Sequence, residues 1–419
     1  MTDLAFYMTE LGKAAKQAAS TLRLAPETQR NAALMAMAKH IKTQQGAILS
    51  ANKKDMVAAQ SKGLSDAMLD RLKLDPNRIE GIAKGLEDIA NLPDPVGAID
   101  KNWTQPNGLE FEKIRVPIGV IGMIYESRPN VTADAGGLCV KSGNACVLRG
   151  GSESAHSSTA IHAALQAGLK EADIPEAAIS LVNTTDRAAV GEMLRGLDGS
   201  IDIIIPRGGK GLVARVQEDA RVPVLAHLEG LNHSYIHEDA DLDMALSVIE
   251  NAKLRRTGVC GSTETCLIDK NIAERALPAL KSRIGDRCEF RGDPTAREII
   301  PDMKLANDTD FATEHLAAIL NIAIVDGLED ALNHIARFGS GHTDAILTNN
   351  EAVARSFLNS VDSAIVLHNA STQYADGGEF GFGAEIGIAT GRLHARGPVG
   401  AEHLTTYKYQ VRGTGQVRP

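Results

Sequence analysis

Short apolar runs alternate with amphipathic helical stretches along most of this chain, and this alternation limits what it can fold into. The runs at residues 145–148, 179–182 and 201–205 are short and aliphatic. Apolar residues recur at helical spacing between them, at 154–170 and 187–197. Repeated strand–helix units predict a parallel sheet with helices on both faces. We therefore expect the α/β class, with a doubly wound parallel sheet.

The pattern extends to both sides of this region. Helices are predicted around residues 34–41 and 79–90, before Pro93 interrupts the helical spacing. A second α/β segment is expected from about residue 232 to residue 350. The remaining predicted strands are at 116–124, where the strand is buried, 222–225 and 404–411, and the remaining predicted helices are at 134–140, 211–218 and 242–249. Asp239 or Asp241 is expected to cap the last of these helices.

The C-terminal strand at 404–411 stands alone after the glycine-rich stretch 377–400. An isolated strand with exposed edges invites aggregation, so it needs a partner. We expect it to pair either with another subunit or with a hairpin that reaches out from the first domain.

Length and charge exclude several classes of protein. The 419 residues suggest roughly two or three domains of about 150 residues each. The formal net charge of -9 argues against nucleic acid as the main partner, because binding a phosphate backbone requires clustered Lys and Arg. The N-terminus does not resemble a secretion signal, and no stretch approaches the roughly 20 apolar residues of a membrane span. We therefore expect a cytoplasmic protein without a membrane partner.

Neither the cysteines nor the histidines predict a metal site. The five cysteines are an odd set without a Cys-x-x-Cys pair, which favours reduced thiols over disulfides or a zinc site. His227, His233 and His237 cluster in the sequence without cysteines or carboxylates at a metal-binding spacing, so ordinary structural histidines explain them better. No metal is expected.

Cys260 is the cysteine whose surroundings suggest chemistry. It lies between Gly258 and Gly261, after a helical run that ends in basic residues at 253, 255 and 256. A nucleophilic thiol needs access for the substrate, which the glycines allow, and positive potential, which the basic residues can supply. The alternative is that Cys260 is a small buried apolar side chain.

Two glycine-rich turns, each between a predicted strand and a predicted helix, are candidates for phosphate binding. Backbone N–H groups and a helix N-terminus converge at such turns. Neither turn has a Gly-x-Gly-x-x-Gly or Walker A pattern, so glycines that only fit a turn conformation remain the alternative. The first turn is Arg149, Gly150, Gly151, Ser152 and Glu153, and the second is Arg207, Gly208, Gly209, Lys210 and Gly211.

Three further polar side chains have a chemical and an ordinary interpretation. The amide of Asn130 can donate to a developing oxyanion, although Pro-Asn is also a common turn. Arg128 can bind an anion or be a surface charge. Glu229 can act as a base or be a solvated carboxylate.

The order of these features resembles the aldehyde dehydrogenase superfamily. More narrowly, the chain is similar to the members of that superfamily that reduce an acyl phosphate of glutamate. The resemblance covers nearly the whole chain. It is carried by residues 116–122, 125–132, 141–144, 148–153, 205–211, 229–230, 258–260, 339–344, 379–381 and 393–398.

The resemblance implies an activity and a set of site residues. The activity is NADPH-dependent reduction of L-glutamyl 5-phosphate to L-glutamate 5-semialdehyde and phosphate through a cysteine thioester, the second step of proline biosynthesis. The nucleophile falls on Cys260 and the amide of the oxyanion site on Asn130. Candidates for substrate binding are Arg128, His342 and Thr343. The cofactor NADPH or NADP falls on Arg149, Gly150, Gly151, Ser152, Glu153, Arg207, Gly208, Gly209, Lys210, Gly211 and Glu379.

The resemblance also implies how the domains are organised. A homo-oligomer is expected, and so is functional coupling with glutamate 5-kinase. The expected parts are an NADP-binding domain from residues 1–102, 119–228 and 360–396, a catalytic α/β domain with the nucleophilic cysteine from 229–359, and a small β oligomerisation element from 103–118 and 397–419.

The sequence departs from the family in two places. Gly261 follows the nucleophile where asparagine is usual, and residues 229–233 read Glu-Gly-Leu-Asn-His where Asp-Gly-Ile-Cys-His is common. Both departures leave the thiol in place and concern substrate contacts. Two alternatives stay open: another semialdehyde dehydrogenase of the superfamily, and a non-catalytic nucleotide-binding homologue.

Overall fold

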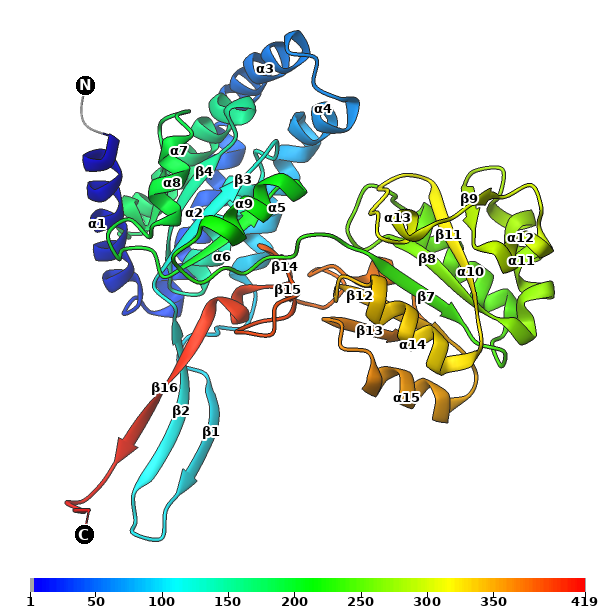
Figure 1. The fold of residues 1–419 in the computed structure, drawn as a ribbon. Helices are drawn as coiled ribbons and strands as arrows, with labels where there is room; N and C mark the ends of the chain where they lie inside the picture. Colours follow the sequence, from blue (N-terminus) through cyan, green and yellow to red (C-terminus); the bar gives the residue numbers. More distant parts are fainter. Residues whose placement is uncertain (1–3, 419) are drawn as a thin grey trace. The chain divides into compact units, whose positions relative to one another are not determined.

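The chain divides into two compact units, each with a parallel sheet of its own (Figure 1). The structure is a computed structural model that describes residues 4–418, so residues 1–3 and 419 of the predicted domains lie outside the described residues. Unit 1 contains the described residues up to Ala226, then Gly381–Gly387 and the chain from Val399 onward. Unit 2 contains His227–Phe380 and Ile388–Pro398.

Unit 1 begins with helices, as the sequence predicts. Helix α5 (Pro76–Ala90) is capped by Asp75, whose carboxylate accepts a hydrogen bond of 2.9 Å from the N–H of Arg78, and Pro76 fills the first turn, where its missing N–H costs nothing. Helix α2 packs against α5 and against the later helix α7 (Ala155–Glu171). The first helices are α1 (Leu4–Leu22), α2 (Glu27–Thr43), α3 (Gln45–Ser61), α4 (Asp66–Leu72) and α5 (Pro76–Ala90).

The sheet of unit 1 is parallel and doubly wound. Its strand order is β5-β4-β3-β6, so the chain moves outward from β3 to β5 and then returns to the other side of β3. Loops at such a reversal leave a crevice at the carboxyl ends of the strands. The strands are β3 (Val120–Tyr125), β4 (Ala145–Gly150), β5 (Ile179–Leu181) and β6 (Ile203–Arg207), and the intervening helices are α6 (Val131–Lys141), α7, α8 (Ala188–Leu194) and α9 (Lys210–Asp219), with short 3-10 turns η1 (Ser152–Ser154) and η2 (Glu176–Ala178).

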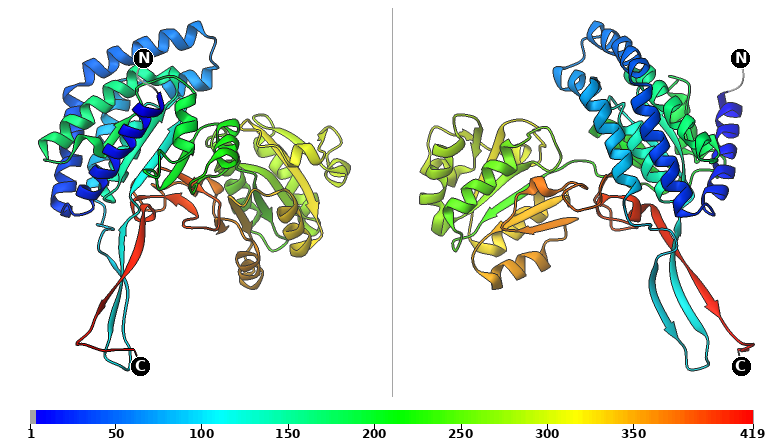
Figure 2. Two further views of the ribbon diagram at one scale, coloured as in Figure 1. Left: turned by 60° about the vertical axis from the view of Figure 1, so that its left-hand side comes forward. Right: turned by 180° about the vertical axis from the view of Figure 1, so that it is seen from behind.

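A separate three-stranded antiparallel sheet contains β1 (Ile99–Thr104), β2 (Glu110–Pro117) and β16 (Thr405–Arg412), with β2 in the middle. The C-terminal strand β16 runs beside β2 in both views of Figure 2. Of the two partners expected for the C-terminal strand, another subunit or a hairpin of the first domain, the structure shows the hairpin.

The predicted strand at 116–124 is wrong, because this stretch belongs to two sheets. Strand β2 ends at Pro117, and β3 begins only at Val120. Gly119 between them has a φ of 139°, and a Cβ there would lie 2.1 Å from a carboxylate oxygen of Asp202. Only glycine fits this bend.

Two further predictions from periodicity need correction. The predicted strand at 222–225 is reduced to one bridge between Ile204 and Val224. The helix predicted at 187–197 is shorter, because α8 ends at Leu194 and both Gly196 and Leu197 have positive φ.

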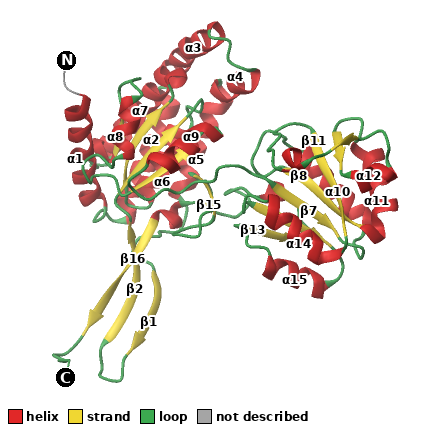
Figure 3. Cartoon of the chain, in the orientation of Figure 1, coloured by secondary structure: helices red, strands yellow, loops and turns green. Residues whose placement is uncertain are grey.

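Unit 2 contains a seven-stranded parallel sheet in the order β10-β9-β11-β8-β7-β12-β13, with helices between successive strands (Figure 3). Strand β8 is buried on both faces: Cys266 and Ile268 enter one apolar core, and Leu267 enters the other. Helix α10 is capped by Asp241, one of the two predicted caps. The strands are β7 (Asn232–Ile236), β8 (Thr263–Asp269), β9 (Glu289–Gly292), β10 (Lys304–Leu305), β11 (Ile319–Val325), β12 (Thr343–Leu347) and β13 (Ile365–His368). The helices are α10 (Leu242–Leu254), α11 (Lys270–Ile284), α12 (Pro294–Ile299), α13 (Asp308–Phe311), α14 (Gly327–Phe338), α15 (Glu351–Ser360) and the 3-10 turn η3 (Thr372–Tyr374).

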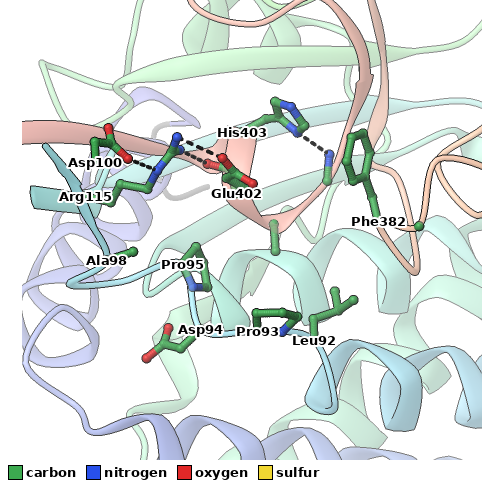
Figure 4. A pocket seen from close by; sticks show the side chains of 13 residues that line it. Leu92, Pro93, Asp94, Pro95, Ala98, Asp100, Arg115, Phe382, Glu402 and His403 are labelled. Atoms are coloured by element: carbon green, nitrogen blue, oxygen red, sulfur yellow. Dashed lines mark hydrogen bonds and ion pairs between the residues drawn. The ribbon is translucent and has the colours of Figure 1, made fainter.

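The remaining short elements are β14 (Gly387–Ala389), β15 (Gly397–Val399) and the 3-10 turn η4 (Ala401–Leu404). Beside η4, unit 1 has a cavity of about 400 Å³ (Figure 4). Arg115 on its wall binds Asp100 at 2.7 Å and Glu402 at 2.8 Å, and Phe382 packs edge-on against His403. None of the residues lining this cavity is one of the predicted site residues. Within the described residues, no helix is long and apolar enough to span a membrane.

Candidate active site

Cys260 lies in the turn between α10 and β8, at the amino end of its sheet. Of the five cysteines, all within the described part of the chain, Cys260 is half-buried and the other four are buried. Burial raises the pKa of Cys266 and Cys139 well above the ordinary thiol value, and that of Cys288 to about 11, which disfavours the thiolate at those three positions. Because a substrate can reach its sulfur, Cys260 is the best candidate for the nucleophile among the five cysteines.

The backbone of the nucleophile turn is held by the neighbouring strand β7. The amide of Asn232 donates to the carbonyl oxygens of Cys260 at 2.6 Å and of Ser262 at 2.9 Å, and its oxygen accepts from the N–H of Thr343 at 3.2 Å. Gly230 lies against this turn so closely that a Cβ on it would stand 2.1 Å from the Cys260 carbonyl oxygen. The position of the thiol thus depends on an amide and a glycine far from it in sequence.

Gly261, the departure from the family beside the nucleophile, also packs closely. A Cβ at this position would lie 3.0 Å from the carbonyl oxygen of Thr372. The contact is tighter than most real Cβ contacts, so a larger residue here would push the η3 segment away.

Two histidines lie beside Cys260. One ring nitrogen each of His227 and His342 and the sulfur of Cys260 all lie within 4.8 Å of one another. Nδ1 of His227 donates to the carbonyl oxygen of Ile388 at 2.9 Å, and Nδ1 of His342 is 2.8 Å from Oγ1 of Thr343. The structure therefore brings together three predicted residues, Cys260, His342 and Thr343, and adds His227, which the sequence suggested was an ordinary histidine.

The basic residues before Cys260 are arranged differently from the expectation. Lys253 is fully buried, and its ammonium binds Glu264 at 2.8 Å. Burial raises the pKa of Glu264 to about 7, and the nearby Lys253 opposes this rise. Because a carboxylate pairs the Lys253 charge inside the core, Lys253 is not the source of positive potential for the thiol that the sequence suggested.

The first glycine-rich turn borders a cavity of about 340 Å³ at the carboxyl ends of β4 and β5. Gly150 and Gly151 line it, together with the start of α7 and the loop 181–185. The guanidinium of Arg149 is nearly buried and donates to the carbonyl oxygens of Gly150 at 2.8 Å and Thr185 at 3.3 Å, while its Nε has no hydrogen-bond partner among the described residues. A buried cation with an unused donor beside a glycine-lined cavity fits a cofactor with an anionic group.

Glu153 and Ser152 complete the first turn. The carboxylate of Glu153 accepts from the backbone N–H of Ser127 at 2.6 Å and from its hydroxyl at 3.0 Å. Ser152 opens η1 on the surface. Glu153 thus ties the turn to the loop after β3.

The second turn connects β6 with α9. Arg207 binds Glu385 at 3.2 Å, and the N–H of Gly209 donates to Oε2 of Glu126 at 3.0 Å. Gly208 lies against the same carboxylate, and Lys210 and Gly211 form the first turn of α9. A carboxylate already uses an N–H donor of this turn, so an anion that binds there must displace it.

Asn130 immediately precedes α6, in the loop after β3. Its amide donates to Oδ2 of Asp134 at 2.8 Å. Burial raises the pKa of Asp134 to about 6, and the Asn130 hydrogen bond opposes this rise. An amide nitrogen carries two hydrogens, so this bond leaves one for an oxyanion. Arg128 lies half-buried in the same loop.

The predicted site residues are divided between the two units. Asn130, Arg128 and both glycine-rich turns belong to unit 1, whereas Cys260, His342, Thr343 and the exposed Glu379 belong to unit 2. Sequence reasoning missed His227 and Asn232 as neighbours of the nucleophile. Their only signal is position, because each lies at or just before the amino end of a strand beside β8.

The sequence profile of the aldehyde dehydrogenase family matches residues 8–300. The chain belongs to the aldehyde dehydrogenase family, which implies a nicotinamide cofactor, and the predicted membership and fold class are confirmed. Within the family, it is similar over its length to proteins named gamma-glutamyl phosphate reductase. That of Caulobacter vibrioides is 60% identical over 413 residues, covering 98% of this chain and 100% of that protein.

Two further similar proteins have the same name. The gamma-glutamyl phosphate reductase of Parvibaculum lavamentivorans is 57% identical over 418 residues, covering 100% of this chain and 99% of that protein. The crystal structure of the Thermotoga maritima gamma-glutamyl phosphate reductase superposes with a TM-score of 0.96 at 42% identity, covering 98% of this chain and 100% of that one.

Proposed function

We propose that this protein catalyses the NADPH-dependent reduction of L-glutamyl 5-phosphate to L-glutamate 5-semialdehyde and phosphate, the second step of proline biosynthesis. The observation that carries the proposal is the half-buried thiol of Cys260, held in a glycine-bounded turn, in a chain similar along its whole length to gamma-glutamyl phosphate reductases. An acyl phosphate is a suitable substrate for a thiolate, because phosphate is a good leaving group.

The proposed reaction has two steps at Cys260. Its thiolate attacks the acyl carbon, the bond from that carbon to the phosphate oxygen breaks, and a thioester forms while the departing phosphate takes up one proton. NADPH, when bound, supplies a hydride to the thioester carbon. The oxyanion that results accepts hydrogen bonds from the Asn130 amide and from a backbone N–H near Cys260, and its collapse releases the aldehyde and restores the thiolate.

We assign the cofactor to the two glycine-rich turns and to Glu379. The cavity beside Gly150 and Gly151 supports this assignment, since it offers space next to a glycine backbone and the nearly buried Arg149. Arg207 and Lys210 are the cations of the second turn. A preference for NADPH over NADH is part of the proposal. So are an NADP-binding domain formed by residues 1–102, 119–228 and 360–396 and a catalytic domain formed by residues 229–359.

Arg128, His342 and Thr343 are the proposed contacts for the charged groups of the substrate's amino-acid end. The buried ring of His342 lies beside Cys260 and contacts the hydroxyl of Thr343, so the two polar groups are held together. Glu229 has no required role in this direction of the reaction, because no water needs to be activated.

The proposal is tested by the phosphate dependence of the reverse reaction. With L-glutamate 5-semialdehyde and NADP, formation of NADPH should require phosphate or arsenate, and Cys260→Ala should abolish it. Oxidation that proceeds equally fast without either anion would identify a hydrolytic aldehyde dehydrogenase instead. Stoichiometric labelling of Cys260 in a protein without turnover would identify a non-catalytic homologue.

We further propose that the β1-β2-β16 sheet mediates homo-oligomer formation. Its outer strands β1 and β16 each pair on one side within the described residues, and β16 exposes Tyr407, Tyr409 and Val411, each to about half of its surface. Val411→Lys should lower the mass measured by light scattering, whereas Leu24→Lys, at another exposed apolar position of unit 1, should not. An unchanged mass for Val411→Lys would exclude this surface as the contact between subunits.

We also propose that the protein is located in the cytoplasm and that it is functionally coupled with glutamate 5-kinase.

A further inference from the structure

Three side chains with ligand atoms for a soft metal meet at Cys260. The sulfur of Cys260 and one nitrogen each of His227 and His342 lie within 4.8 Å of one another. In a tetrahedral zinc site, with bonds of about 2.0–2.3 Å, neighbouring ligand atoms are about 3.5 Å apart. Side-chain rotations that bring these three atoms closer together would close the set around one ion.

The three ligands are fixed by adjacent strands of one sheet. Cys260 precedes β8, His227 precedes β7 and His342 directly precedes β12, and these strands are neighbours in the order β8-β7-β12. All three residues belong to unit 2, so the arrangement is set within a single compact unit. A site on the ends of paired strands needs little reorganisation to bind an ion.

The hydrogen bonds of the two imidazoles orient them as metal ligands. Nδ1 of His227 donates to the carbonyl oxygen of Ile388 at 2.9 Å, which leaves the lone pair of the neutral ring on Nε2. Nδ1 of His342 contacts Oγ1 of Thr343 at 2.8 Å. Zinc-binding histidines characteristically use one nitrogen for the ion and the other for such a contact.

His342 provides a second, independent sign of a missing ligand. Its side chain is fully buried, and its Nε2 has no hydrogen-bond partner among the described residues. A buried ring nitrogen without a hydrogen-bond partner costs folding free energy, because it has lost its hydrogen bonds to water and gained none in the protein. A metal ion bound at Nε2 would remove that cost.

We propose that Cys260, His227 and His342 bind a zinc ion reversibly, and that the bound ion holds the enzyme inactive by occupying the nucleophile. On binding, the Cys260 thiol releases its proton to solvent, a Zn–S bond and two Zn–N bonds form, and a water fills the fourth position. Two imidazoles and one thiolate favour zinc over magnesium or calcium, which prefer oxygen ligands. Binding stands on the geometry alone, whereas inhibition rests on the proposed function.

Sequence spacing could not show this site. The ligands come from segments that are 33 and 82 residues apart in the chain and meet only through strand pairing. The local cluster His227, His233 and His237 contributes one of them; His233 instead pairs with Asp344 at 3.0 Å, and His237 contacts Thr348 at 3.2 Å.

The test uses the untagged full-length protein and cobalt as a spectroscopic probe for the zinc site. Titration with Co²⁺ should produce a thiolate-to-cobalt charge-transfer band and strong tetrahedral d–d bands that saturate at one ion per chain. Added Zn²⁺ should remove both sets of bands. Cys260→Ala should abolish the charge-transfer band, and His227→Ala and His342→Ala should each weaken cobalt binding by about tenfold or more.

Two control variants match the ligand variants. Cys288→Ala removes another buried thiol of unit 2, and His368→Ala removes a histidine of β13 whose ring contacts the carbonyl oxygen of Thr348, away from Cys260. Both should keep the cobalt spectrum of the wild type. If circular dichroism shows that His342→Ala, a substitution at a buried position, does not fold, a second variant remains. His227→Ala, at a half-buried position, still tests whether a histidine binds the ion.

Activity measurements complete the experiment. Zn²⁺ should inhibit the wild-type reductase, a chelator should restore activity, and His227→Ala should raise the inhibitory zinc concentration by about tenfold or more. An active enzyme without the charge-transfer band, or with a band that survives Cys260→Ala, would overturn the zinc site. A wild-type protein that shows the band but has no reductase activity would instead overturn the proposed function and leave the metal site standing.

Discussion

Gly230→Ala is the substitution that tests most directly how the nucleophile turn is held. The added Cβ would lie 2.1 Å from the carbonyl oxygen of Cys260, 2.8 Å from its carbonyl carbon and 2.9 Å from its Cα. Ordinary van der Waals contact begins at 3.4 Å, so the backbone of the turn must move by more than 1 Å to accept one methyl group. All three contacts are with backbone, which cannot rotate away as a side chain can.

A displacement of about 1 Å in a catalytic group costs about 100-fold in rate, which is about 2.7 kcal/mol of activation free energy. The overpacked core should also lose about 1–3 kcal/mol of stability. We therefore expect kcat to fall by about two orders of magnitude, with KM changed much less and a lower unfolding midpoint. Steady-state kinetics and thermal unfolding monitored by circular dichroism measure these quantities.

Gly258→Ala is the matched control for this prediction. It adds the same methyl group two residues before Cys260, where no atom of the described residues, apart from the two chain neighbours, lies within 4 Å of the new Cβ. This variant should keep kcat and the unfolding midpoint of the wild type. A Gly230→Ala enzyme that behaves like Gly258→Ala would refute the conclusion that close packing against Gly230 positions the thiol.

Three other expectations follow from the site. Cys260→Ser should lose nearly all reductase activity while keeping the circular dichroism spectrum of the wild type, and substantial remaining turnover would exclude Cys260 as the nucleophile. Glu126→Ala should lower the Kd for NADPH about fivefold, measured by fluorescence titration, because removing the carboxylate that competes for the Gly209 N–H is worth about 1 kcal/mol; a weaker complex would count against phosphate binding at that turn. Burial raises the pKa of Glu264 from 4.5 to about 7, so this carboxyl contributes stability below pH 4.5 that is lost as the pH rises through 7. The unfolding free energy of the wild type should therefore fall, relative to Glu264→Gln, between pH 5 and pH 8 in urea titrations, and a constant difference would contradict the raised pKa.

Much of the fold was predictable because periodicity reports which faces are buried. The alternation of apolar runs and helical stretches between residues 145 and 205 identified the doubly wound sheet, and the isolated C-terminal strand required a partner, which β2 provides. Periodicity failed where one apolar run serves two sheets, as at Pro117 and Val120, since a bend at Gly119 leaves no trace in hydropathy.

The site was predictable only in part, for a related reason. Glycines around Cys260 can be recognised locally, but Asn232 and His227 reach it through strand pairing, which sequence spacing does not encode. The charge of Lys253 could be counted from the sequence, whereas its partner Glu264 could not be known until both side chains were placed in the core.

The helices that flank the predicted site residues have opposite directions in the two units, so opposite ends of their dipoles lie next to those residues. In unit 1 the glycine-rich turns precede α7 and α9, so the positive ends of helix dipoles face whatever binds there. In unit 2 the polarity is reversed: α10 and α14 end shortly before Cys260 and His342, and it is their carbonyl ends that approach the site. The helix dipoles of unit 1 are therefore suited to hold anions, whereas those of unit 2 favour a cation beside the thiol.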